Sequence, residues 1–175
     1  LANLKAKVSG TIGINAASIG GFAWGDWSLT KPGYLTFDFT KWKEAVDLGD
    51  IGRLSRIVIH EFTHIFNADR DSNPKYWTEF QSLAAKQGVF SSYAGRNNLE
   101  TLPEVVGYYV ARCAKDNPYD TGKFNAYYEW VKTNIFAGRE FGPAPGTKAS
   151  CDVTQDQIPT PEPSTPDWVK ALSGE

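Results

Sequence analysis

The chain has 175 residues, of which 41% are hydrophobic and 14% aromatic, enough to bury one substantial core in a single domain. Its formal net charge of −2, with dispersed lysines and arginines, offers no basic face for nucleic acid. No apolar run approaches the ~18 residues that a membrane helix requires. We therefore expect a monomer with no nucleic-acid partner and no membrane association.

Strands are expected in the first forty residues, which are rich in glycine, threonine and aromatic residues. Apolar residues alternate with others over 8–14 and 34–39, which is the period of a half-buried strand. These segments predict a small mixed sheet at the N-terminal end of the chain.

Helices are expected over most of the remaining chain. Thr40 is a candidate cap for the first helix, and Asn73 followed by Pro74 is typical of a helix start. Apolar spacing and glycine stops predict helices at about 40–49, 52–67, 73–88, 101–115 and 124–135. The fold class expected is therefore α+β, with the sheet followed by a mainly helical region.

A change in composition divides the chain into a body at 1–142 and a C-terminal tail at 143–175. Six of the ten prolines lie between Pro143 and Pro166, and such a segment favours an extended, polyproline-like path. The tail reads either as a spacer that lies against the body or as a linker to a further domain.

The two cysteines, Cys113 and Cys151, can form one disulfide that ties the tail to the body, or they can be two buried free thiols. The chain begins at Leu1 and contains no methionine, as expected of a mature chain after N-terminal processing. We therefore expect a secreted, extracellular protein.

The only two histidines of the chain lie four residues apart in His60-Glu61-Phe62-Thr63-His64, an HExxH motif. On a helix this spacing places both imidazoles on one face, where they can bind one Zn²⁺, with Glu61 beside them to act on water. Apolar residues flank the motif, and Arg53 and Arg56 are expected on the other side of the helix. The alternative is a helix with two buried, hydrogen-bonded histidines.

A catalytic zinc needs a third protein ligand. The chain has no third histidine and no methionine, which excludes the metzincin pattern, and no Gly-Thr-x-Asp sequence follows the motif. A glutamate remains, and the candidates are Glu79, Glu100, Glu104, Glu129 and Glu140. Glu100 and Glu104 are four residues apart, so on one helix one of them can bind the metal while the other orients a ligand histidine.

At these residues the chain resembles the zinc endopeptidases related to the anthrax lethal factor catalytic domain and the bacterial Pro-Pro endopeptidases. The matching elements are the HExxH helix, Ser92-Tyr93, Glu100 to Glu104, and Tyr108-Tyr109. The resemblance implies a zincin-like metalloprotease fold in which His60, His64 and Glu100 bind one catalytic Zn²⁺. It also implies that Glu61 is the general base, that Tyr93 donates to the oxyanion, and that Glu104 is an outer residue behind the ligands.

The candidate residues outside the motif also have ordinary structural interpretations. Thr101 and Glu104 fit a capping box at the start of a helix. Tyr93 fits a packed core tyrosine with a hydrogen-bonded hydroxyl. Glu79 is the main rival to Glu100 as third ligand, although a solvated edge position explains it without a metal.

These observations predict a secreted zinc endopeptidase (gluzincin) that acts on a protein or peptide substrate by activating water, with Glu61 as base. The substrate is expected to pair in an extended form with an edge strand, for which residues 34–39 are the candidate. Two alternatives stay open: a protease-like binding protein without catalysis, and a zinc hydrolase that acts on a non-protein amide such as peptidoglycan.

Overall fold

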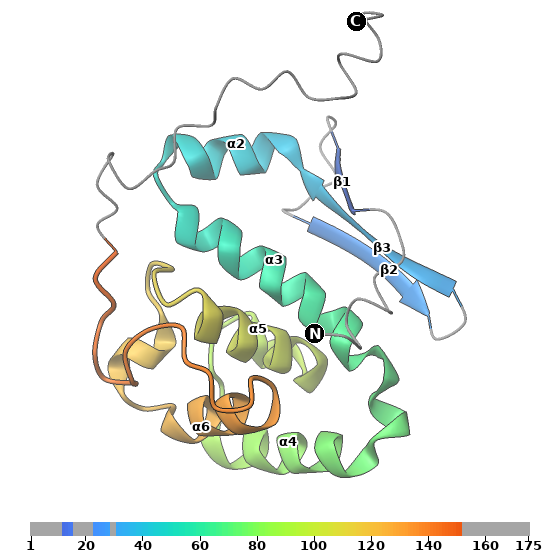
Figure 1. Ribbon diagram of the computed structural model, residues 1–175, viewed down its shortest axis with the longest axis vertical. Helices are drawn as coiled ribbons and strands as arrows, with labels where there is room; N and C mark the ends of the chain where they lie inside the picture. Colours follow the sequence, from blue (N-terminus) through green and yellow to red (C-terminus); the bar gives the residue numbers. More distant parts are fainter. Residues whose placement is uncertain (1–11, 16–22, 29–30, 152–175) are drawn as a thin grey trace, which may run out of the picture.

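The computed structural model describes residues 12–15, 23–28 and 31–151, and this part of the chain is mainly helical (Figure 1). Within the described residues, three strands precede the helices: β1 (Ile12–Asn15), β2 (Ala23–Ser28) and β3 (Lys31–Asp38). β3 is the central strand, parallel to β1 and antiparallel to β2, with Phe37 opposite both Ile14 and Ala23.

The position of β3 corrects one expectation. Residues 34–39 were the candidate edge for a substrate, but β3 pairs on both sides, so its backbone donors and acceptors are already used by β1 and β2. Among the described strands, β2 is the outer strand that lies beside the helix of the HExxH motif (Figure 1). The first part of the strand predicted over 8–14, residues 8–11, lies outside the described part of the chain.

Five α-helices follow the strands in the described part of the chain, and all but the last begin at a side chain that caps a free backbone N–H group. They are α2 (Phe39–Asp47), α3 (Ile51–Phe66), α4 (Pro74–Gln87), α5 (Asn98–Val110) and α6 (Asn125–Asn134). Three short 3₁₀ helices lie between them: η1 (Asn67–Ser72), η2 (Ala94–Arg96) and η3 (Pro118–Thr121). The predicted Asn73 cap and Pro74 start of α4 are confirmed.

Two predicted helix starts are wrong. Asp38, not Thr40, caps α2, because its side chain accepts from the Lys41 N–H. Asn97 caps α5 by accepting from the Glu100 N–H, so the helix begins one turn before Thr101. Glu100 therefore lies in the first turn of α5, while the helix ends at Val110 rather than near 115.

The main core is built from aromatic residues around α5. Its fully buried members include Phe80, Tyr109, Tyr119, Tyr127 and Tyr128. The buried tyrosine hydroxyls keep hydrogen-bond partners: Tyr119 donates to the Val105 carbonyl at 3.1 Å, and Tyr127 donates to the Gly88 carbonyl at 3.1 Å. Burial of these large rings fixes α5, the helix that carries Glu100 and Glu104.

Two glycines allow close contacts of α3. A Cβ on Gly107 would lie 3.1 Å from the Arg56 carbonyl oxygen, so α5 approaches α3 closely there. A Cβ on Gly52 would lie 2.5 Å from the Cys113 carbonyl oxygen and 2.6 Å from the Ala114 backbone. Both neighbours of Gly52 are backbone atoms, which cannot rotate away.

Gly52→Ala is expected to destabilise the protein by about 1–3 kcal/mol or more, since added volume at a close backbone contact forces the chain to shift. Urea unfolding of the purified variant measures the change. Gly95→Ala is the matched control, because its Cβ meets only the exposed Val89 side chain. Equal stability of the two variants would contradict the close packing of Gly52.

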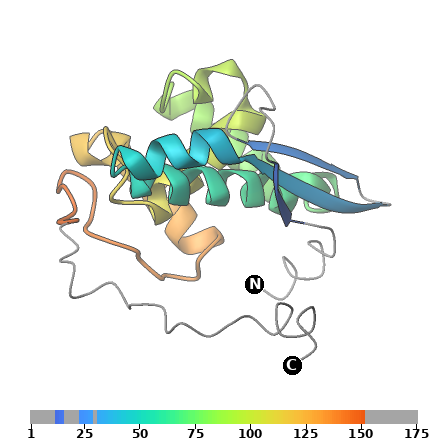
Figure 2. The ribbon, with the colours of Figure 1, turned by 90° about the horizontal axis from the view of Figure 1, so that it is seen from above.

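The start of the tail packs against the body. Arg112 donates to the carbonyls of Pro143 and Thr147, and the Gly146 N–H donates to the Tyr119 carbonyl at 2.9 Å. A disulfide joins Cys113 to Cys151, so the alternative of two free thiols is wrong. Figure 2 shows this orange segment on the side of α3 away from the green α4. The rest of the tail, 152–175, lies outside the described residues.

Loss of the disulfide is expected to lower the free energy of unfolding by about 3–4 kcal/mol, because the bond closes a long loop in the unfolded chain. The loop spans a sequence separation of 38 residues. Urea unfolding with and without reductant measures the loss. The Cys113→Ser/Cys151→Ser double variant should have the same free energy of unfolding as the reduced protein, and added reductant should not change it. A parent protein that is equally stable in both conditions would contradict the expectation.

None of the helices in the described ranges combines the length and the apolar character needed to cross a membrane.

Candidate metal centre

His60 and His64 lie on consecutive turns of α3, and their Nε2 atoms are 3.1 Å apart. The helix predicted at about 52–67 spans Ile51–Phe66, begins at the Asp50 cap and packs its apolar side against Phe37 and the rest of a small second core. His60 is only 6% exposed. The two imidazoles are therefore held on one face of a fixed helix, as the motif predicts.

Glu100 completes a triangle with the two histidines. Its Oε2 atom lies 3.3 Å from His60 Nε2 and 3.4 Å from His64 Nε2. Ligand atoms arranged tetrahedrally around zinc at about 2.0–2.1 Å are themselves about 3.3–3.4 Å apart. The distances within the triangle thus fit three ligands of one metal ion.

A second observation supports this fit. Glu100 Oε2 is buried and makes no hydrogen bond within the described residues, although a buried carboxylate oxygen normally has a partner. Two imidazole nitrogens and one carboxylate oxygen form a ligand set that zinc accepts. Within the described part of the chain, His60, His64 and Glu100 are also the group whose ligand atoms lie close enough to hold an ion.

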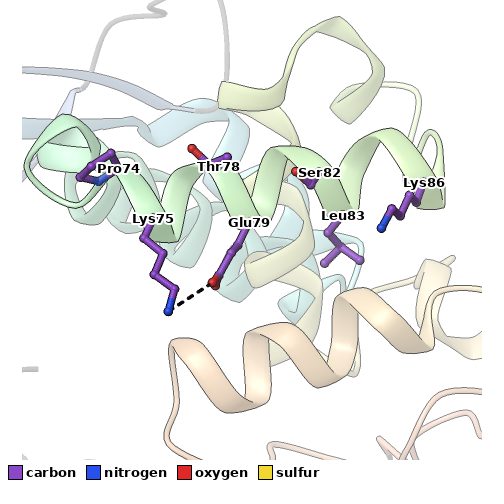
Figure 3. A pocket seen from close by; sticks show the side chains of 7 residues that line it. All are labelled: Pro74, Lys75, Thr78, Glu79, Ser82, Leu83 and Lys86. Atoms are coloured by element: carbon purple, nitrogen blue, oxygen red, sulfur yellow. Dashed lines mark ion pairs between the residues drawn. The ribbon is translucent and has the colours of Figure 1, made fainter.

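The rival glutamates lie elsewhere. Glu79 is exposed on α4 and pairs with Lys75 at 3.8 Å, beside a shallow hollow lined by that one helix (Figure 3). Glu129 is exposed on α6. Glu140 pairs with Lys132 at 3.1 Å and accepts from the Tyr128 hydroxyl. None of these three glutamates belongs to the group of possible metal ligands that contains the two histidines.

Glu61 follows His60 directly on α3 and is half-buried. Burial raises the pKa of Glu61, while the neighbouring His60 lowers that pKa and Glu100 raises it. The net direction is upward. A carboxyl whose pKa moves toward neutrality is better suited to take up a proton and then return it.

The environments of the two histidines differ. Burial lowers the pKa of His64 to about 4, and the charge of His60 acts in the same direction. Burial also acts to lower the pKa of His60, but its contacts with Glu100 and Glu104 outweigh this and raise it. His64 is therefore neutral at pH 7, and a neutral imidazole has a free lone pair for a metal.

Glu104 lies behind His60 rather than at the start of its helix. Its carboxylate is 2% exposed and its Oε1 is 3.1 Å from His60 Nδ1. Arg56 Nη1 donates to the same oxygen, and Ser91 Oγ donates to Oε2 at 2.7 Å. The capping-box interpretation is wrong, because the carboxylate contacts three distant residues while Asn97 caps the helix.

Tyr93 lies at the exposed side of the site. Its side chain is 39% exposed, so the interpretation as a packed core tyrosine is wrong. The ring meets the His60 ring edge-on at a centroid distance of 5.7 Å, and the Arg96 guanidinium lies 4.1 Å from its centroid. Burial and the charge of Glu100 raise the pKa of the Tyr93 hydroxyl, which keeps it protonated as a donor.

Ionisable groups from α3 and α5 alternate along the contact between the two helices. The order is His64, Glu100, His60, Glu104 and Arg56, ending at Tyr108, whose ring lies 4.9 Å from the Arg56 guanidinium. Sequence reasoning missed Arg56 and Ser91. Arg56 lies four residues before His60, and this spacing could have indicated that both side chains share one face of the helix. The expectation that Arg56 lies on the other side of the helix is therefore wrong.

Comparison of the chain with family models, with curated proteins and with solved structures finds no match.

Proposed function

We propose that this protein is a zinc-dependent endopeptidase of the glutamate-ligand class, with His60, His64 and Glu100 as the protein ligands of one ion. The observation that carries the proposal is the triangle of ligand atoms with sides of 3.1, 3.3 and 3.4 Å. Three protein ligands leave a fourth position open, as catalytic zinc sites require, whereas a structural site is closed by four.

The fold and the location belong to the same proposal. The sheet before α2 and the two helices that carry the ligands are compatible with a zincin-like α+β fold. The Cys113–Cys151 disulfide supports a secreted protein, because disulfides persist in oxidising compartments.

When bound, zinc supplies Lewis acidity that polarises the scissile carbonyl and makes water acidic at neutral pH. Glu61 accepts the proton of the attacking water and later returns it to the leaving amine. Its half-buried position and raised pKa favour both transfers. Glu104 contacts Nδ1 of His60 and thereby orients Nε2 of the same ring toward His64 and Glu100, the other two proposed ligands.

Tyr93 is proposed as the donor to the oxyanion. Its ring contacts the His60 ring edge-on and the guanidinium of Arg96, while its side chain remains accessible. A donor aimed at the developing negative charge contributes mainly in the transition state. Loss of the hydroxyl should therefore lower kcat more than it raises KM.

A substrate peptide is proposed to bind in an extended form beside α3. β2 replaces residues 34–39 as the candidate strand, since it is the outer described strand on the side of α3. Pairing of backbone groups with a strand edge suits an internal peptide segment and thus an endopeptidase.

The test is digestion of a proteome-derived peptide library by the zinc-loaded protein, with new termini read by mass spectrometry. Cleavage that stops on chelation and returns with zinc is expected. An intact library in the presence of folded, zinc-loaded protein would refute general endopeptidase activity. Peptidoglycan fragments in a parallel digest distinguish the hydrolase of a non-protein amide, and no cleavage in either digest favours a binding protein.

A further inference from the structure

Glu104 is held by three donors that come from two parts of the chain, the helix α3 and the loop before η2. Arg56 Nη1 on α3 and His60 Nδ1 share its Oε1, whereas Ser91 Oγ in the loop before η2 donates to Oε2. The carboxylate is 2% exposed, so water cannot readily replace a missing donor. Arg56 at Oε1 and Ser91 at Oε2 therefore fix the orientation of the carboxylate, and His60 contacts the oxygen that it shares with Arg56.

Arg56 is itself held in place. It lies one helical turn before His60, which allows both side chains to reach the same oxygen. Its guanidinium stacks on the Tyr108 ring at 4.9 Å, and the side chain is only 21% exposed. The absence of a Cβ at Gly107 leaves room for the Arg56 stem, whose Cγ would otherwise lie 3.2 Å from that atom.

We infer that Arg56 and Ser91 are positioning residues that set the metal affinity of the centre by fixing Glu104, and through it the ring of His60. Arg56 donates to Oε1 through Nη1 while its planar guanidinium stacks on the Tyr108 ring, a combination that lysine cannot reproduce. Ser91 prevents rotation of the carboxylate about its own axis by holding the second oxygen. This inference rests on the proposed zinc site but not on the peptidase reaction.

The experiment measures zinc affinity by competition with a chromophoric chelator, in the absence of any substrate. Arg56→Gln should weaken zinc binding about 10–100-fold, the effect typical of outer residues that orient a metal ligand. Arg56→Lys should restore only part of the affinity, and Ser91→Ala should weaken binding about tenfold. Arg53→Gln is the matched control, because Arg53 lies on the same helix and pairs with Asp50 instead.

A double-mutant cycle separates positioning from a general loss of structure. If Arg56 acts through Glu104, the Arg56→Gln/Glu104→Gln variant should bind zinc no more weakly than Glu104→Gln alone. Multiplied losses in the double variant would overturn the inference, as would parental affinity in folded Arg56→Gln. If Arg56→Gln does not fold, Ser91→Ala decides, and unchanged affinity there overturns the inference. A parent protein that binds no zinc would instead refute the metal centre itself.

Discussion

Replacing Glu61 with glutamine is expected to reduce peptide hydrolysis by about 10²–10⁴-fold, the usual loss when a general base is removed. Glutamine keeps the size and polarity of the side chain but cannot accept the proton of the attacking water. Because Glu61 is not among the three groups that form the ligand triangle, the variant should still bind one equivalent of zinc. The loss should appear in kcat, measured on a peptide identified in the library digest.

Glu129→Gln is the matched control for this experiment. It makes the same chemical change at an exposed position on α6, so hydrolysis should remain at the parental rate. Parental activity in Glu61→Gln, with zinc content unchanged, would exclude Glu61 as the base. Loss of zinc together with activity would show that Glu61 supports the metal rather than the proton transfer.

Zinc removal is expected to destabilise the folded protein strongly. A ligand that binds only the native state stabilises it by about 4 kcal/mol when its free concentration is 1,000 times the Kd. Two of the three proposed ligands come from α3 and the third from α5, so the ion joins helices that are distant in the chain. Thermal unfolding after chelation, and again after zinc is restored, measures this contribution.

Variants of the ligands make the expectation specific. Glu100→Gln and His64→Ala should bind zinc at least about 100-fold more weakly, since even outer residues cost 10–100-fold. Their Tm should therefore no longer rise when zinc is added at a concentration that saturates the parent. Glu79→Gln, on the exposed face of α4, should respond as the parent does. A zinc response in Glu100→Gln equal to that of the parent would exclude Glu100 as a ligand.

The helix of the motif and its two histidines could be predicted because their signals are local, whereas Glu100 was predicted by excluding other ligands and by the family resemblance. His60 and His64 share a face through their spacing, and the structure places Glu100 beside them. The Asn73-Pro74 start of α4 is likewise a short-range pattern, and it is confirmed. Such signals depend on a few neighbouring residues, so the structure that they predict does not depend on contacts with distant parts of the chain.

Where two local patterns compete, the sequence cannot decide between them. Thr101 and Glu104 fit a capping box, but Asn97 fits a cap equally well, and the burial of Glu104 against Arg56 and His60 settles the choice. Arg56 was placed on the solvated side because a charged residue is usually exposed. Only the contact with α5 supplies the carboxylate that makes its burial favourable.

The order of the strands is a non-local property. Residues 34–39 have the alternation of a strand that is half exposed, but the pattern does not reveal its neighbours. β1 and β2 come from separate segments and pair on either side of β3. The missing information was therefore the pairing, not the presence of the strand.

The disulfide has a consequence for a protein proposed to cut peptide chains. Cys113 and Cys151 enclose α6, η3 and the loops around them within one covalent ring. If one molecule nicks another within 114–150, the two fragments stay joined, and a denaturing gel without reductant shows a single band. Autolysis in this region becomes visible only after reduction, so purity judged under oxidising conditions overstates the fraction of intact chain.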